Sequence, residues 1–209
     1  MTYALLCPVA LASEYTTIEK ESFAEWKDRG SRFFAYAWPV NDEEEIKSRL
    51  HGLKEKYPDA THHCYAWVLG ADRSRFRAND DGEPGHSAGT PILRQIHSFT
   101  LSHVLVVVVR YYGGVNLGVP GLIHAYGHAT RMALEASSIV KRKLQKKAVL
   151  RFPFGEEGNA YHLVYKLSAK VNAFDHEPEP VLYLQYDADR GEELNELLTH
   201  YPKIKVSEV

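Results

Sequence analysis

The sequence of 209 residues is poor in cysteine and carries no strong net charge of either sign. Only Cys7 and Cys64 occur, which excludes a disulfide-rich scaffold and fits a reducing compartment. The formal net charge is −2, so no global basic field attracts nucleic acid or membranes, and any nucleic-acid surface has to be a local patch. No segment approaches the ~20 apolar residues of a membrane span. We therefore expect a cytoplasmic protein without membrane contact.

The N-terminal segment MTYALLCPVALAS has the apolar stretch and small residues of a signal peptide but lacks its positively charged start. The first basic residue is Lys20, and Pro8 interrupts the apolar stretch. Both features argue against secretion and favour the cytoplasmic assignment.

One stretch matches a catalytic motif by its letters alone. Gly85-His86-Ser87-Ala88-Gly89 has the G-x-S-x-G pattern, which requires the serine on a sharp turn between a buried strand and a helix. Here an acidic turn ending in Pro84 precedes the motif, and Thr90-Pro91 predicts a helix that starts two residues late. We therefore expect no serine nucleophile and no other catalytic residue.

The 11 histidines raise the question of a metal site. His124 and His128 are four residues apart and share a helix face, and His62-His63 form a second pair. Further ligands would have to come from the acidic turn Asp80–Glu83, and no HExxH or paired CxxC is present. The favoured interpretation is a turn held by side-chain hydrogen bonds, with the histidines at a strand start, so we expect no metal and no cofactor.

The most informative segment is Val104–Gly127, VLVVVVRYYGGVNLGVPGLIHAYG. Its unbroken Val/Leu run predicts a strand buried on both faces. A glycine-rich loop follows, and a helix beginning near Pro120 would direct its free N–H groups at that loop. This pattern predicts an anion or nucleic-acid site with a basic group, a stacking face and amide donors; alternatively, the glycines only permit a tight connection. The expected contact residues are Arg110, Tyr111, Tyr112, Gly113, Gly114, Asn116, Gly118, Gly121 and His124.

Strand and helix signals are mixed along the first 140 residues. Alternating apolar residues predict strands over 31–40 and 63–70, with 73–78 pairing back on the second. Capping signals predict a helix from Asn41 or Asp42 to about Tyr57, and a short helix capped by Thr90. These elements predict an α+β domain over residues 1–140.

After residue 140 the composition changes. The basic run Lys141–Lys147 is typical of a linker or a solvated first turn. The expected elements beyond it are strand 148–154, helix 157–169, strands 170–174 and 181–187, helix 190–200 and strand 203–207. Their βαββαβ order is that of a ferredoxin-like domain, expected over residues 143–209, so the predicted fold class is two-domain α+β.

Three blocks together resemble the YigZ/IMPACT family. They are PDATHHCYAW at 58–67, DDGEP at 80–84, and RYYGG at 110–114 with GLIHAYG at 121–127. The resemblance covers about residues 15–140, and the tail looks like the ferredoxin-like domain that bacterial members append. It implies a first domain like the second domain of small-subunit ribosomal protein five, with a left-handed crossover, and a second domain similar to one of elongation factor G. The motif residues it adds to the site are His62, His63, Asp80, Asp81 and Glu83.

The chain departs from the family pattern around the glycine loop. Val119-Pro120 stand where the family has small residues, and His124 stands where it has Lys or Arg. A proline removes an N–H donor, and a histidine is mostly uncharged at neutral pH, so both changes weaken the expected anion site.

The resemblance also implies a function in binding, since eukaryotic relatives are implicated in translational control through the amino-acid-starvation kinase pathway. We expect a non-catalytic protein linked to translation regulation or stress response, with RNA or the translation machinery as its partner. Two alternatives remain open. One is an enzyme acting on a small phosphorylated ligand, with Asp80, Asp81 or Glu83 as acid, base or metal ligand; the other is a protein–protein adaptor.

Overall fold

The computed structural model describes residues 13–176 and 178–208 and divides the chain into two units. One unit is Tyr15–Arg142, and the other comprises Lys143 onward together with Glu14. Each has its own sheet and its own core, so the predicted α+β class with two sheet-containing regions is confirmed. The domain limits 1–140 and 143–209 stay a prediction, because the N-terminal residues, including Cys7 and most of the signal-like segment, lie outside the described residues.

The first unit is built on a five-stranded sheet in which all neighbouring strands are antiparallel. Its spatial order is β2 (Ser22–Asp28), β3 (Ser31–Pro39), β6 (Val104–Tyr111), β4 (His62–Leu69) and β5 (Arg75–Asn79). The Val-rich run lies at the centre in β6, and each residue from Val104 to Val109 is 0% exposed. The sequence pattern therefore predicted this strand correctly, because only a central strand covered on both faces can be apolar throughout.

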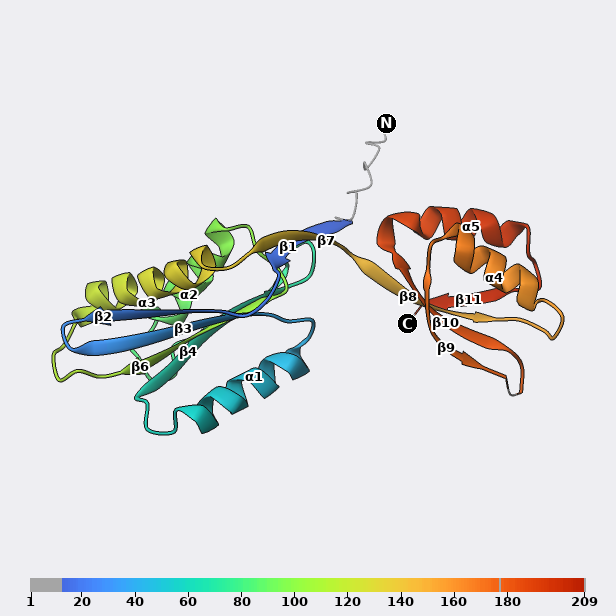
Figure 1. The fold of residues 1–209 in the computed structure, drawn as a ribbon. Coiled ribbons are helices and arrows are strands. Elements are labelled where there is room, and N and C mark those ends of the chain that lie inside the picture. The colour runs from blue at the N-terminus through green and yellow to red at the C-terminus, as the bar shows by residue number, and fades with distance from the viewer. Residues whose placement is uncertain (1–12, 177, 209) are drawn as a thin grey trace, which may run out of the picture. The chain divides into compact units, whose positions relative to one another are not determined.

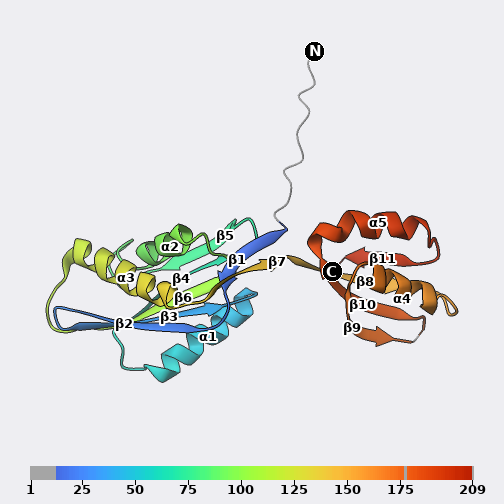
Figure 2. The same cartoon turned by 45° about the horizontal axis from the view of Figure 1, so that its top comes forward.

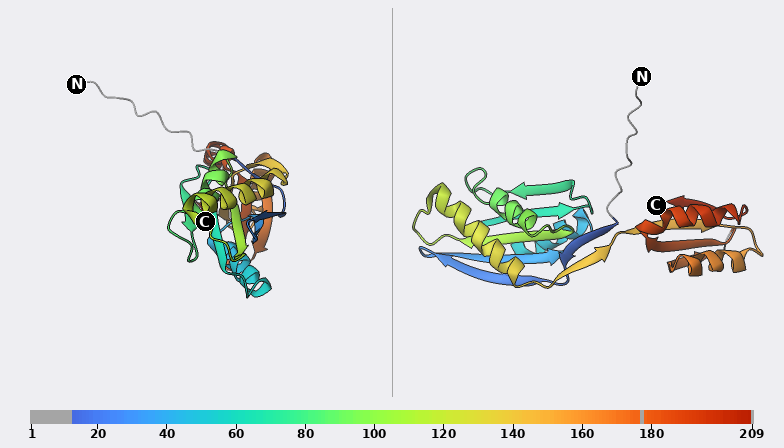
Figure 3. Two further views of the ribbon diagram at one scale, coloured as in Figure 1. Left: turned by 90° about the vertical axis from the view of Figure 1, so that its left-hand side faces the viewer. Right: turned by 90° about the horizontal axis from the view of Figure 1, so that it is seen from above.

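Helices cover both faces of this sheet (Figure 1). On one face, Ile46 and Leu53 of α1 (Glu43–Lys56) join a core that includes Leu105, Val107 and Val109. On the other face, α2 (Gly89–Ser98) and α3 (Gly118–Glu135) share a core with Val104, Val106 and Val108. These two helices lie side by side on the sheet (Figure 3). The two-residue period of β6 thus divides its side chains between two cores.

The helix starts agree only in part with expectation. Asp42 caps α1 as predicted, because its Oδ1 accepts a 2.8 Å hydrogen bond from Glu45 N. The expected cap at Thr90 is wrong: α2 begins at Gly89 with Ala88 as its N-cap. The cause lies outside the local sequence, since Asp80 Oδ1 accepts hydrogen bonds from the N–H groups of Ala88 and Gly89. Helix α3 begins at Gly118, two residues before the expected Pro120.

Two strands form a separate small sheet that the sequence interpretation missed. β1 (Glu14–Ile18) pairs with β7 (Ile139–Lys143). The basic residues of β7 were expected to be a linker or a solvated first turn. The division between the two units does fall among them, between Arg142 and Lys143, but they form a strand and not a turn. A short strand with an exposed, charged sequence gives no alternation signal, and only its partner from the other end of the unit defines it.

The second unit has a four-stranded antiparallel sheet with the order β11-β8-β10-β9 (Figure 2). Its two helices pack on one face of that sheet, where Leu150, Leu163 and Leu182 form the core. This is the predicted βαββαβ order. The elements are β8 (Gln145–Arg151), α4 (Glu157–Lys166), β9 (Lys170–Asp175), β10 (Val181–Asp187), a short 3-10 turn (Ala188–Arg190), α5 (Gly191–Thr199) and β11 (Lys205–Glu208). Within the described part of the chain, no helix is long and apolar enough to cross a membrane.

Candidate functional site

A cleft of about 480 Å³ lies in the first unit where the end of β6, the acidic turn after β5 and the start of α3 meet. Polar side chains from the acidic turn, the end of β6, residues 61–62 and the glycine loop line it, together with apolar side chains. Its lining comprises Thr61, His62, Glu83, Pro84, Arg110, Tyr112, Asn116, Leu117, Gly118, Val119 and Leu122. The acidic turn and the glycine loop therefore share one cleft, a relationship that the sequence left undetermined.

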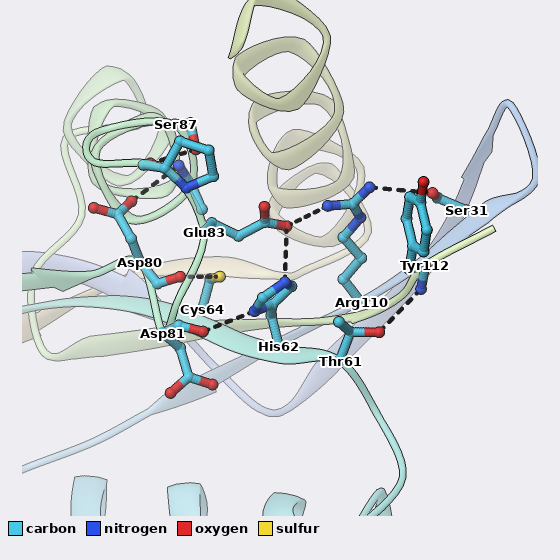
Figure 4. Close-up of polar contacts among 12 residues, drawn as sticks. Ser31, Thr61, His62, Cys64, Asp80, Asp81, Glu83, Ser87, Arg110 and Tyr112 are labelled. Atoms are coloured by element: carbon cyan, nitrogen blue, oxygen red, sulfur yellow. Dashed lines mark hydrogen bonds and ion pairs between the residues drawn. The ribbon is translucent and has the colours of Figure 1, made fainter. Parts of the chain in front are cut away.

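A buried ion pair forms one wall of the cleft (Figure 4). Arg110 Nη1 lies 2.5 Å from Glu83 Oε1, and the two side chains are only 6% and 4% exposed. Arg110 Nη2 also donates to Ser31 Oγ at 3.3 Å. Glu83 therefore offsets the positive charge that was expected to face a phosphate, so the pair is close to neutral as a unit. A phosphate-binding role for Arg110 stays a prediction.

The Glu83 carboxylate also accepts a hydrogen bond from a tyrosine of the buried core. Tyr126 Oη donates to Glu83 Oε1 at 2.8 Å. Burial raises the pKa of Tyr126 well above its usual range, so the phenol stays protonated and able to donate. Cys64 Sγ lies 3.3 Å from Tyr126 Oη, and burial raises the pKa of this free thiol too. Sequence reasoning missed Tyr126 as a site residue, because its spacing is that of the buried face of a helix.

His62 borders the cleft with a defined ring orientation (Figure 4). Its Nδ1 lies 2.8 Å from the Asp81 carbonyl oxygen, which can only accept, so Nδ1 carries the proton. The other nitrogen, Nε2, lies 3.8 Å from Glu83 Oε1. With the proton on Nδ1, Nε2 is an acceptor that borders the cleft, so a donor group of a ligand can bind there.

Two of the three expected acidic residues hold the loop together and do not line the cleft. Asp80 accepts from the N–H groups of His86, Ala88 and Gly89. Asp81 Oδ2 accepts from His63 N at 2.7 Å. These carboxylates are used by backbone donors, so only Glu83 of the acidic turn remains as a group that faces a ligand.

The glycine loop is shaped by a close contact between two backbones. A Cβ on Gly113 would lie 1.9 Å from the Gly30 carbonyl carbon, so only glycine fits there. Gly113 N donates to Ser31 Oγ, and Tyr112 N donates to Thr61 Oγ1. The loop amides at 112 and 113 are thereby used inside the protein and are not free for an anion. The start of α3 at Gly118 has no side-chain cap and borders the cleft.

Several expected site residues lie elsewhere. Tyr111 points to the α1 side, packs with Phe34 and Tyr57, and donates to Asp59 at 2.7 Å. His63 is buried beside Asp81, and His124 stacks on His128 at 5.6 Å in a separate groove of α3. The structure thus brings together His62, Glu83, Arg110, Tyr112, Asn116 and Gly118, and it leaves Tyr111, His63, His124, Asp80, Asp81, Gly113, Gly114 and Gly121 off the cleft lining.

The structure also places Ser87 of the G-x-S-x-G pattern and the side chains that could bind a metal ion. Ser87 is 0% exposed and its Oγ donates to the Pro84 carbonyl oxygen, so it is unavailable as a nucleophile. Over residues 13–176 and 178–208, no group of three or more His, Cys, Asp or Glu side chains is placed to hold a metal ion.

Exposed apolar side chains lie along the glycine loop and the start of α3, a feature that the sequence interpretation missed. Two of them, Tyr112 and Val119, line the cleft, and Ile123 lines the separate groove beside His124. Tyr112, Val115, Val119 and Ile123 are 46%, 49%, 45% and 36% exposed. They come from the glycine loop and the first two turns of α3, where Val119 and Ile123 share one helix face. We call these four residues the apolar rim. Such a rim beside a polar cleft is typical of a surface that binds a partner.

The fold is that of a two-unit α+β protein with a cleft in its first unit, and comparison with known proteins identifies its family. The Impact N-terminal domain matches residues 29–134. The chain is 30% identical to the IMPACT family member YigZ of Escherichia coli over 175 residues, covering 83% of this chain and 86% of YigZ. The chain belongs to the IMPACT family.

Other relatives match over smaller or larger parts. YvyE of Bacillus subtilis is 36% identical over 132 residues, which are 63% of this chain and 61% of YvyE. A crystal structure described only as that of a hypothetical protein is similar over 95% of this chain and 98% of its own, with 25% identity and a TM-score of 0.77. A structure of Yih1, a two-domain translational regulator, covers 58% of this chain and 47% of Yih1 at 30% identity, with a TM-score of 0.35.

Proposed function

We propose that this chain is a non-catalytic binding protein that acts in translation regulation by docking a protein component of the translation machinery at the Arg110–Glu83 cleft. The IMPACT family includes a translational regulator, and this chain belongs to that family. A cytoplasmic location follows from the proposed role.

The apolar rim carries this proposal. Four large apolar side chains, each at least 36% exposed, lie on the glycine loop and the start of α3. Two of them, Tyr112 and Val119, line a cleft whose buried charges compensate each other. Protein partners bury such aromatic and aliphatic groups, whereas a phosphate backbone requires uncompensated cations. Glu83 Oε1 already accepts from Arg110 and Tyr126, so a hydrogen-bond donor from the partner would find its acceptor at His62 Nε2.

The RNA and enzyme interpretations of the same loop have less support. RNA at this loop would need Arg110 to leave Glu83, or phosphate to bind next to a carboxylate. A small phosphorylated substrate meets the same obstacle, and Asp80 and Asp81 are already bound by backbone N–H groups.

Co-sedimentation with purified Escherichia coli ribosomes and their isolated subunits tests the proposal. We expect binding that persists at moderate salt and is weakened at least about fivefold by Val119→Ser or Tyr112→Ser. Phe76→Ser is the matched control, because Phe76 is 55% exposed in the same unit and does not line the cleft. Binding that is equally sensitive to the control, or absent altogether, would contradict the proposal.

A salt series on naked RNA distinguishes the competing interpretation. If Arg110 contacts a phosphate, the double variant Arg110→Gln, Glu83→Gln should reduce the slope of affinity against salt by about one charge. Both glutamines are uncharged, and glutamine has the same size as Glu83 but is shorter than Arg110. We expect no such change.

A further inference from the structure

The sheet of the second unit has one face that its helices do not cover. Leu150, Leu182 and Leu184 point into the core beneath α4 and α5. Because strand side chains alternate, the odd-numbered residues of β8 and β10 point to the opposite face. We call this opposite side the open face. It does not include any residue of the cleft in the first unit.

An exposed tyrosine lies at the centre of the open face. Tyr183 on β10 pairs directly with Val149 on β8, and these are the two middle strands. Val149 also pairs with Ser207 on β11, and Tyr183 pairs with Ala173 on β9. The ring therefore stands between small or aliphatic neighbours and is 41% exposed. A flat apolar ring in that position can accept a second flat ring on its outer side.

Cations surround this tyrosine. The register places Lys205 opposite Arg151, and Lys170 opposite Gln185, which is itself opposite Lys147. All four basic residues are exposed, and none is in an ion pair with another described residue. The carboxylates on the same face are Asp175 at the β9 edge, and Asp187, which is already bound by Lys143 at 2.8 Å. The open face is thus locally basic although the whole chain has a net charge of −2.

We propose that the open face binds single-stranded nucleic acid, with a base stacked on Tyr183 and the phosphates on either side contacting Lys147, Arg151, Lys170 and Lys205. Residues on neighbouring strands lie about 5–8 Å apart, which is the scale of successive nucleotides. An aromatic platform within a ring of cations is the chemistry by which sheets hold unpaired bases. In a duplex the bases are paired and stacked on each other, so none is available to stack on Tyr183. This site is separate from the one under Proposed function, and either can fail alone.

Fluorescence anisotropy with the full chain tests this site. The probes are a fluorescein-labelled 12-nucleotide oligouridine, the matching oligodeoxythymidine, and a duplex of equal length, each in a salt series. We expect both single strands to bind more tightly than the duplex. Tyr183→Leu should weaken single-strand binding roughly 5- to 150-fold, the range that corresponds to loss of one stacked base. Tyr183→Phe keeps the ring and should bind like the unmodified chain.

Three further variants separate stacking from folding and from charge. Tyr165→Leu is the matched control, because Tyr165 is 80% exposed on α4 in the same unit, and it should change nothing. Lys147→Ala or Lys205→Ala should each reduce the salt slope by about one charge. Equal binding by the Tyr183→Leu variant and the unmodified chain, a preference for duplex, or equal competition by polyglutamate would overturn the proposal. A preference between the two single strands would show whether RNA or DNA is the ligand.

Discussion

The guanidinium of Arg110 and the carboxylate of Glu83 form a 2.5 Å ion pair that joins the end of the central strand to the acidic turn. Tyr126 supports the carboxylate from the core, and Ser31 supports the guanidinium from β3. Arg110 Nε remains buried without a partner in the described part of the chain. The pair therefore fixes the wall of the cleft, and it also makes Arg110 a poor choice for a simple binding test, since its removal changes more than a surface charge.

Removing one member of the pair should destabilise the first unit. We expect Arg110→Leu to lower the free energy of unfolding by about 3–5 kcal/mol, because Glu83 is left buried without its cation. Tryptophan fluorescence during urea unfolding measures this change. The three tryptophans, Trp26, Trp38 and Trp67, all lie in the first unit and report on it alone.

The double variant Arg110→Met, Glu83→Leu is the control for that prediction. It removes both charges and keeps most of the volume, so we expect it to recover most of the lost stability. A double variant as unstable as the single one would mean that the hydrogen bonds to Ser31 and Tyr126, and not the charge balance, hold the wall together.

A second prediction compares two glycines. Gly113→Ala should cost about 1–3 kcal/mol in the same unfolding experiment, because the new methyl group would overlap the Gly30 backbone. Gly52→Ala meets no atom within 4 Å in the middle of α1 and should stabilise the unit by roughly 0.5–1 kcal/mol. Equal effects of the two substitutions would show that the Gly113 and Gly30 backbones leave room for a methyl group.

The local sequence predicted the elements whose burial is continuous or strictly periodic. The Val run predicted β6, and the cap at Asp42 predicted α1, because each signal arises within one segment. The start of α2 could not be found in this way, since a carboxylate nine residues away sets it. The edge strands β1 and β7 depend on pairing across more than 100 residues.

The sequence predicted which residue types belong to the candidate site, but not how their side chains pair. The motifs predicted that polar and charged side chains belong to the site, and three of these residues do meet in one cleft: His62, Glu83 and Arg110. Their charge balance was not predictable, because Arg110 and Glu83 are 27 residues apart and pair only in the fold. Tyr111 shows the same limit: it neighbours Tyr112 in the chain, yet strand alternation turns the two to opposite faces of the sheet.

A third prediction concerns Cys64. Burial raises the pKa of its thiol well above the usual range, so little thiolate is present to react at pH 8. In a Cys7→Ser chain, we expect Ellman's reagent to leave Cys64 unmodified under native conditions and to titrate one thiol after denaturation. Rapid native reaction would show that the core around Tyr126 opens readily.

The last prediction is a pH dependence of stability that arises from two histidines. Burial lowers the pKa of His63, against partial opposition from Asp81, and burial also lowers the pKa of His103. In the unfolded chain both rings take up a proton near pH 6.5, whereas the folded state resists until a lower pH. The unfolded state then binds more protons, so stability falls as the pH drops below about 6.5, by up to about 1.4 kcal/mol per pH unit for each ring.

His63→Gln should remove part of that slope, and adding His103→Gln should remove a further part. Urea unfolding of the first unit between pH 5 and 7 measures the slope, and identical slopes in all three chains would show that neither ring is buried in its neutral form.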